Sequence, residues 1–349
     1  MRDAAGERLR AGDRPAADDH DRGEDAAGRD HLSGDARATW RVAPSAGSLP
    51  GVSDGLQAGA VAPANEEAVR AWDTVLYERW KQNRKVFVGA LTEVTEDLFD
   101  RFPPPPGGRC IDIGCGFGET TQRLAELVGA DGFALGTDSS PRFIEDARLE
   151  AAESGVAPEN IGFEVADAQT AEWGPEYDYA FSRMGTQFFA APVPAMRAIR
   201  GALKPGGGLR KICWRRKGES QFWAETEGVV ERFLTRPAEY DADTCGPGPF
   251  SLGNPETLEG ILTAAGFEEI ELHSRDFDYF MGGDMEEAVD SLLAIGPGAE
   301  LIRLNGEHGE SRREEIAEAL REHYRQWQQP DGSIVGRAAV WIVGATNPA

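Results

Sequence analysis

The sequence predicts a doubly wound α/β fold, in which a parallel sheet is covered by helices on both faces. Two observations predict it. Between residues 110 and 214, short apolar runs of strand length alternate with segments whose apolar residues recur at helical spacing. A glycine-rich turn also stands between the first apolar run and the first helix, which is the order that α/β units use to bind nucleotide-type ligands.

The alternation predicts each element of the sheet in turn. We expect strands at 110–113, 132–137, 161–165, 177–181 and 209–214, and helices at 120–128, 141–154 and 194–203. Pro141 stands in the first turn of its helix, where proline is well tolerated. The pattern then continues with helices at 221–234, 255–265, 285–295 and 311–327, a strand that begins at 267 and a final strand at 338–343.

The chain divides into regions of different composition. Residues 1–65 have hardly any large apolar side chains, so we expect a disordered tail. Residues 66–102 carry aromatic and aliphatic residues at helical spacing and are expected to form N-terminal helices that act as a lid. Residues 103–349 are expected to form the main domain, with 215–255 and 283–330 as insertions on the substrate side.

The charge of the chain excludes several classes of partner. Sixty acidic residues against 36 basic ones give a formal net charge of −24, which disfavours nucleic acid and anionic lipid as partners. No apolar run approaches the roughly 20 residues of a membrane span. The four cysteines form no CxxC pair, so we expect no metal site and a cytoplasmic protein with reduced thiols. The pattern favours a small-molecule substrate and a monomer or homodimer.

The most informative segment is Ile-Asp-Ile-Gly-Cys-Gly-Phe-Gly at residues 111–118. Its D-x-G-x-G-x-G spacing differs from the G-x-G-x-x-G of dinucleotide sites, which is suited to a pyrophosphate. An acid at the end of the strand instead suits a ligand that carries cationic groups. The candidate binding residues of this loop are Asp112, Gly114, Cys115, Gly116 and Gly118.

On this loop and the motifs at the following strand ends, the sequence resembles class I S-adenosylmethionine-dependent methyltransferases. It is similar to the ubiquinone/menaquinone-type small-molecule methyltransferases over roughly residues 66–349. The resemblance implies S-adenosylmethionine as cofactor and methyl transfer to oxygen, nitrogen or carbon of a small acceptor. It also implies the strand order 3-2-1-4-5-7-6, with the seventh strand antiparallel and the rest of the sheet mostly parallel.

The resemblance also assigns residues at later strand ends to the cofactor. An acid after the second strand accepts the ribose hydroxyls, an acid after the third lies near the adenine amino group, and the fourth strand ends at the crevice where the strand order reverses. These candidates are Asp138, Ser139, Asp167, Ala168, Ser182 and Arg183. Tyr77 and Trp80 of the N-terminal helices either cover the cofactor or belong to the core.

Two other functions remain open at this point. An NAD(P)-dependent oxidoreductase would also place an acid such as Asp138 on a ribose, although the glycine spacing and Asp167 argue against it. A non-catalytic S-adenosylmethionine-binding protein is the third interpretation, because the sequence has no evident catalytic base. His273, at the end of an expected strand, is a weak candidate for that role.

Overall fold

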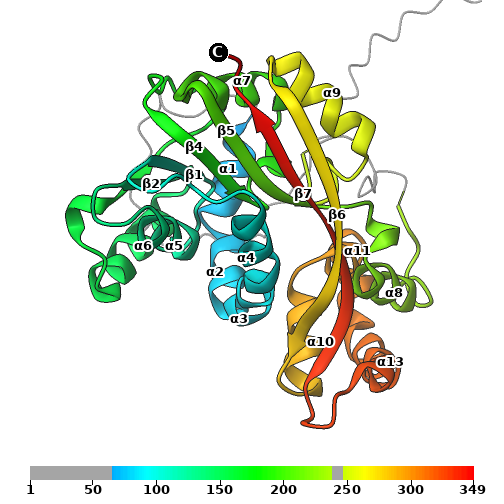
Figure 1. Ribbon diagram of the computed structural model, residues 1–349. Coiled ribbons are helices and arrows are strands. Elements are labelled where there is room, and N and C mark those ends of the chain that lie inside the picture. Colours follow the sequence, from blue (N-terminus) through cyan, green and yellow to red (C-terminus); the bar gives the residue numbers. More distant parts are fainter. Residues whose placement is uncertain (1–64, 238–246) are drawn as a thin grey trace, which may run out of the picture. The chain divides into compact units, whose positions relative to one another are not determined.

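A seven-stranded sheet organises the chain in the computed structural model, which describes residues 65–237 and 247–349 (Figure 1). The strand order is β3-β2-β1-β4-β5-β7-β6, and β7 runs antiparallel to both of its neighbours. The predicted fold class and strand order are therefore confirmed. The strands are β1 (Arg109–Ile113), β2 (Phe133–Asp138), β3 (Ile161–Val165), β4 (Tyr177–Arg183), β5 (Leu203–Trp214), β6 (Glu268–Gly282) and β7 (Ile334–Thr346).

Helices cover the sheet on both faces because residues of β4 alternate between two cores. Tyr179 and Phe181 face a core shared with α4 and α5, whereas Ala180 faces a core shared with α7 and α9. α6 packs against β2 and β3. These helices are α4 (Thr92–Arg101), α5 (Glu119–Val128), α6 (Pro141–Ser154), α7 (Pro192–Ala202) and α9 (Pro255–Ala265).

Local sequence signals set the ends of several of these helices. The Ser140 hydroxyl accepts a hydrogen bond from the Phe143 amide at 3.4 Å, and Pro141 follows it as the first residue of α6. Asn254 caps α9 through two backbone amides, and Gly266 ends that helix with φ +91°. Capping residues in the sequence therefore determine where α6 begins and where α9 begins and ends.

The last two strands are much longer than the sequence indicated. Tyr279 of β6 pairs with Gly336 of β7, well beyond the parallel part of the sheet. The helices α8, α10, α11 and α13 gather around this extension (Figure 1). The extension gives the added helices a surface to pack on. They are α8 (Gln221–Val230), α10 (Met285–Ala294), α11 (Pro297–Leu304), α12 (Gly306–Ser311) and α13 (Arg313–Tyr324).

Two expected helices in this part of the chain have different bounds. α8 ends at Val230 rather than 234, and the helix expected at 311–327 is α13 followed by a 3₁₀ turn over Arg325–Trp327. The prediction missed α11, because Pro297 and Gly298 are typical of a loop. Proline is nevertheless compatible with the first turn of a helix, and there it stands in α11.

The N-terminal region consists of short helices in the part of the chain that the structure describes. They are α1 (Glu66–Trp72), α2 (Val75–Gln82), α3 (Arg84–Phe87) and then α4. Of the tail expected at 1–65, residues 1–64 lie outside the described residues, as do residues 238–246. Of the helices that can be described, none is long and apolar enough to cross a membrane.

Candidate functional site

The glycine loop follows β1 and is held at the end of β2. The amides of Gly114 and Cys115 both donate to the Thr137 carbonyl, at 2.8 and 3.0 Å. Gly114, Gly116 and Gly118 have φ values of +72°, +55° and +85°, a region that residues with a Cβ atom rarely adopt. The sequence thus has glycine where this backbone requires it.

The three glycines differ in what surrounds them. A Cβ atom on Gly114 would lie 3.0 Å from Gly185, and one on Gly118 would lie 2.8 Å from the Phe163 ring. At Gly116, in contrast, the nearest heavy atom that a Cβ would meet is 4.0 Å away. The outer two glycines are required by packing within the protein, whereas the middle one leaves space that a ligand can use.

Asp112 lies next to this loop, and only one of its two carboxylate oxygens accepts hydrogen bonds from the described residues. The side chain is only 1% exposed, and its Oδ2 accepts hydrogen bonds from Thr120 at 2.6 Å and Thr121 at 2.8 Å. Its Oδ1 has no hydrogen-bond partner within the residues described. Burial raises the pKa of Asp112 to about 6, although the two hydroxyls oppose the shift. A cationic group at Oδ1 would favour the ionised form.

Asp138 connects the end of β2 to the same loop. Its Oδ2 accepts a hydrogen bond from the Gly116 amide at 3.1 Å, and its Oδ1 accepts one from the Ser140 amide at 2.9 Å. Burial raises the pKa of Asp138 to about 6, against these backbone donors. Ser139, between the two, is half-buried.

Asp167 and Ala168 follow β3 and are both buried. The Asp167 carboxylate accepts hydrogen bonds from the Gln169 amide at 3.0 Å and from the Asn65 side chain at 3.2 Å. The chain therefore reaches the end of β3 just before α1 begins. Sequence reasoning missed Asn65, because nothing local relates it to a residue 102 positions away.

The end of β4 brings Ser182 and Arg183 to the other side of the loop. The Ser182 hydroxyl donates to the Ile113 carbonyl at 2.8 Å, which connects β4 to the end of β1. Arg183 Nη1 donates to the Thr95 hydroxyl of α4 at 3.3 Å. Burial lowers the pKa of Arg183, while the charges of Glu119 and Asp112 oppose the shift.

An aromatic cluster from α1, α2, α6 and the loop covers this edge. The Tyr77 ring lies 5.1 Å from Phe143 and 6.2 Å from Phe117, and its hydroxyl donates to Asp146 at 2.5 Å. Burial and the Asp146 contact raise the pKa of Tyr77. Tyr77 is thus next to the glycine loop, whereas Trp80 stacks on Phe87, with ring centroids 5.1 Å apart.

Asp73 is a second residue that sequence reasoning missed. It follows α1, and its Oδ1 accepts hydrogen bonds from the Ser140 hydroxyl at 2.7 Å and from the Arg142 amide at 3.3 Å. The N-terminal helices are therefore connected to the first turn of α6, directly after Asp138. An acid between two helical segments is the only sequence signal for this contact.

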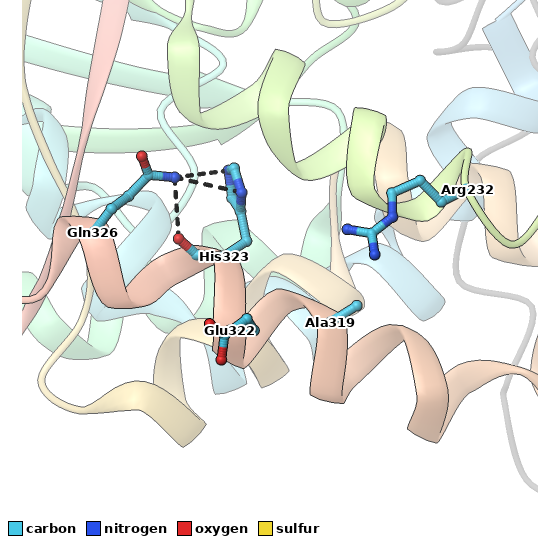
Figure 2. A pocket seen from close by; sticks show the side chains of 5 residues that line it. All are labelled: Arg232, Ala319, Glu322, His323 and Gln326. Atoms are coloured by element: carbon cyan, nitrogen blue, oxygen red, sulfur yellow. Dashed lines mark hydrogen bonds between the residues drawn. The ribbon is translucent and has the colours of Figure 1, made fainter.

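His273 is not brought together with the other candidates. It lies on β6, the edge strand, four strands away from β1, and its Nε2 lies 3.0 Å from a Glu271 carboxylate oxygen. A hollow of about 380 Å³ is also separate from the loop, on α13 and the residues after α8 (Figure 2). Its lining residues are Arg232, Ala319, Glu322, His323 and Gln326. Across residues 65–237 and 247–349, no three metal-ligating side chains gather.

The raised pKa of Asp112 predicts how stability changes with pH. The folded state holds the proton up to about pH 6, whereas the unfolded chain loses it near pH 4. The unfolding free energy therefore falls as pH rises from about 4 to 6, by up to about 3 kcal/mol from this group. Denaturant unfolding of Asp112→Asn should show a shallower decline over that window. An identical slope in both proteins would contradict the assignment.

The match to known families covers the part of the chain around this loop. Residues 105–227 match a family model described as a methyltransferase domain. Aklanonic acid methyltransferase DauC of Streptomyces sp. (strain C5) is 35% identical over 118 residues, which are 34% of this chain and 53% of that protein. Ubiquinone biosynthesis O-methyltransferase of Cereibacter sphaeroides is 36% identical over 121 residues, 34% of this chain and 47% of that protein. The chain thus spans about half the length of these relatives.

Solved structures show a similar fold over most of the chain. The structure of the [4+2]-cyclase SpnF covers 83% of this chain and 98% of its own, with a TM-score of 0.51 and 19% sequence identity. At that identity the likeness concerns the fold alone. The motif at residues 111–118 lies inside the matched segment, and the predicted resemblance to methyltransferases is confirmed for residues 105–227.

Proposed function

We propose that this protein transfers a methyl group from S-adenosylmethionine to a small-molecule acceptor. The observation that carries the proposal is the buried Asp112 carboxylate, one oxygen of which has no hydrogen-bond partner among the described residues, next to a glycine loop. S-adenosylmethionine has a cationic ammonium group and no phosphate, so an acid suits it better than the pyrophosphate of a dinucleotide. The relatives named as O-methyltransferases support the same reaction.

The residues present fit this cofactor in three places. Asp112 would hold the ammonium group, and the free space at Gly116 lets the ligand approach the backbone. Asp138 would accept the ribose hydroxyls, because each carboxylate oxygen has a lone pair beyond its backbone donor. Asp167 would accept from the adenine amino group. When bound, the cofactor supplies a methyl group on a sulfonium.

The protein's own contribution is to position the reactants and to exclude water. In-line displacement at a methyl group depends strongly on the approach of the nucleophile, so a rigid loop accelerates it. The rings of Trp72, Tyr77 and Phe143 pack over the loop edge and keep solvent out. An acceptor that is already anionic needs no protein base, which agrees with the position of His273 far from the loop.

The alternative functions are supported less well. The D-x-G-x-G-x-G spacing disfavours an NAD(P) cofactor. In the structure these glycines form one loop, which is hydrogen-bonded to the Thr137 carbonyl. Non-catalytic binding of S-adenosylmethionine would agree with the position of His273 far from the loop. It would not explain why the relatives are named as methyltransferases. We also propose that the acceptor is a small molecule and that the protein is cytoplasmic. The net charge of −24 supports the first, and three buried free thiols among the described residues support the second.

Calorimetric binding measurements distinguish an S-adenosylmethionine site from an NAD(P) site. We expect S-adenosylhomocysteine, the product form of the cofactor, to bind the whole chain, and NADH not to bind. Transfer of a labelled methyl group to members of a panel of phenols, acids and amines then tests for catalysis. Binding of NADH alone would overturn the proposal, and binding of S-adenosylhomocysteine without transfer to any acceptor would favour the non-catalytic alternative.

The difference between glycines gives a matched pair of variants. Gly116 and Gly155 both have positive φ, +55° and +82°, and a Cβ at either meets no atom nearer than 4.0 Å. Gly155 ends α6 in the left-handed conformation, where alanine should destabilise the fold by about 1–2 kcal/mol. We expect Gly116→Ala to weaken S-adenosylhomocysteine binding at least about tenfold and Gly155→Ala to leave it unchanged. Equal affinities in the two variants would show that Gly116 does not face the ligand.

The N-terminal helices at 66–102 are proposed to act as a lid, with Tyr77 and Trp80 on its inner side. Asn65 and Asp73 connect these helices to Asp167 and Ser140, so ligand binding at those strand ends should order them. Hydrogen exchange over residues 66–100 should slow when S-adenosylhomocysteine is added. Strong protection without ligand that does not change on binding would show that both aromatic residues are permanent core.

A further inference from the structure

Arg183 has hydrogen-bond donors that the described residues do not use, although the nearby charges of Glu119 and Asp112 favour its charged form. Its guanidinium makes one long hydrogen bond, to the neutral Thr95 hydroxyl at 3.3 Å. No carboxylate of residues 65–237 or 247–349 forms an ion pair with it. The neighbouring Arg84 is bound by both Glu119 and Glu150. An arginine keeps its charge even where burial lowers its pKa. The other guanidinium nitrogens of this half-buried side chain are not shut off from solvent, so a ligand anion can reach them.

The sheet register places Arg183 on the same face of the sheet as Asp112, on the neighbouring strand and two residues further along. Asp112 of β1 pairs with Phe181 of β4, and side chains two residues apart on a strand lie on the same face. Arg183 therefore lies one step further toward the carboxyl end, at the level of Gly114. A guanidinium with free donors and an acid with a free oxygen thus flank the same loop.

The backbone holds Arg183 in this place. Met184, the next residue, has φ +61°, a conformation that costs a non-glycine residue roughly 1–2 kcal/mol. Its amide donates to the Ile212 carbonyl at 2.9 Å, while Ser182 is bound to Ile113. Strained residues that neighbours hold in position are concentrated at ligand sites. The end of β4 is therefore already organised before any ligand binds.

We propose that Arg183 binds a carboxylate of a ligand held over the glycine loop. The proposal rests on the proposed function, and the carboxylate has two possible sources: the amino-acid end of the cofactor or an acidic methyl acceptor. Arginine suits this task because its planar fork donates two parallel hydrogen bonds to a carboxylate. The same position would orient an anionic acceptor beside the methyl group.

The cofactor arm compares S-adenosylhomocysteine with 5′-methylthioadenosine, which lacks the amino-acid end. If the cofactor is the source, Arg183→Gln weakens S-adenosylhomocysteine binding about tenfold or more in calorimetry and leaves 5′-methylthioadenosine unchanged. Arg183→Lys keeps the charge without the fork and should restore part of the loss. Arg275→Gln is the matched control, because Arg275 also contacts α4 but is bound by Asp97 and Glu93.

The acceptor arm uses protein saturated with S-adenosylhomocysteine and titrated with benzoate or benzamide. If the acceptor is the source, the unaltered protein prefers benzoate and Arg183→Gln loses that preference, while its affinity for S-adenosylhomocysteine stays the same. The proposal is overturned if the unaltered protein binds S-adenosylhomocysteine and Arg183→Gln, with an unchanged melting temperature, differs from it in neither arm. Failure of the unaltered protein to bind S-adenosylhomocysteine would instead reject the proposed function itself.

Discussion

The attachment of the glycine loop to the end of β2 is the constraint on which the site depends. Two loop amides share the Thr137 carbonyl, and the Gly116 amide donates to Asp138. These bonds require parallel strands side by side and a backbone with positive φ, so they connect the sheet topology to three glycines. If β2 moved relative to β1, the loop, Asp112 and the first turn of α6 would separate.

The charges at this edge follow from its position in the fold. The carboxyl ends of neighbouring parallel strands meet there, and each contributes a side chain: Asp112 from β1, Asp138 from β2 and Arg183 from β4. Burial raises the pKa of both acids. Arg183 forms no ion pair with a carboxylate among the described residues. A zwitterionic ligand would complement both signs of charge, as the proposed function requires.

The sequence could predict the parts of the fold that depend on neighbours along the chain. The buried strands, the glycine turn and the acids after β2 and β3 all have local signals, and the strand order came with the family resemblance. Asn65 and Asp73 had none, because they reach the site only when the N-terminal helices fold back onto it. The long extension of β6 and β7 was also missed, since its strands are stabilised by helices that pack on it from the insertion.

Asp112 is the group proposed to meet the cationic end of the ligand, and proton release on binding tests this most directly. Calorimetric titration with S-adenosylhomocysteine at pH 6, in two buffers that differ in ionisation enthalpy, gives the number of protons exchanged on binding. Because the pKa of Asp112 is raised to about 6, a cation placed beside it should expel a fraction of a proton at pH 6 and almost none at pH 8. Asp112→Asn should reduce the release to what Asp138, whose pKa is also raised to about 6, contributes. Proton uptake, or equal release by the variant, would contradict the account.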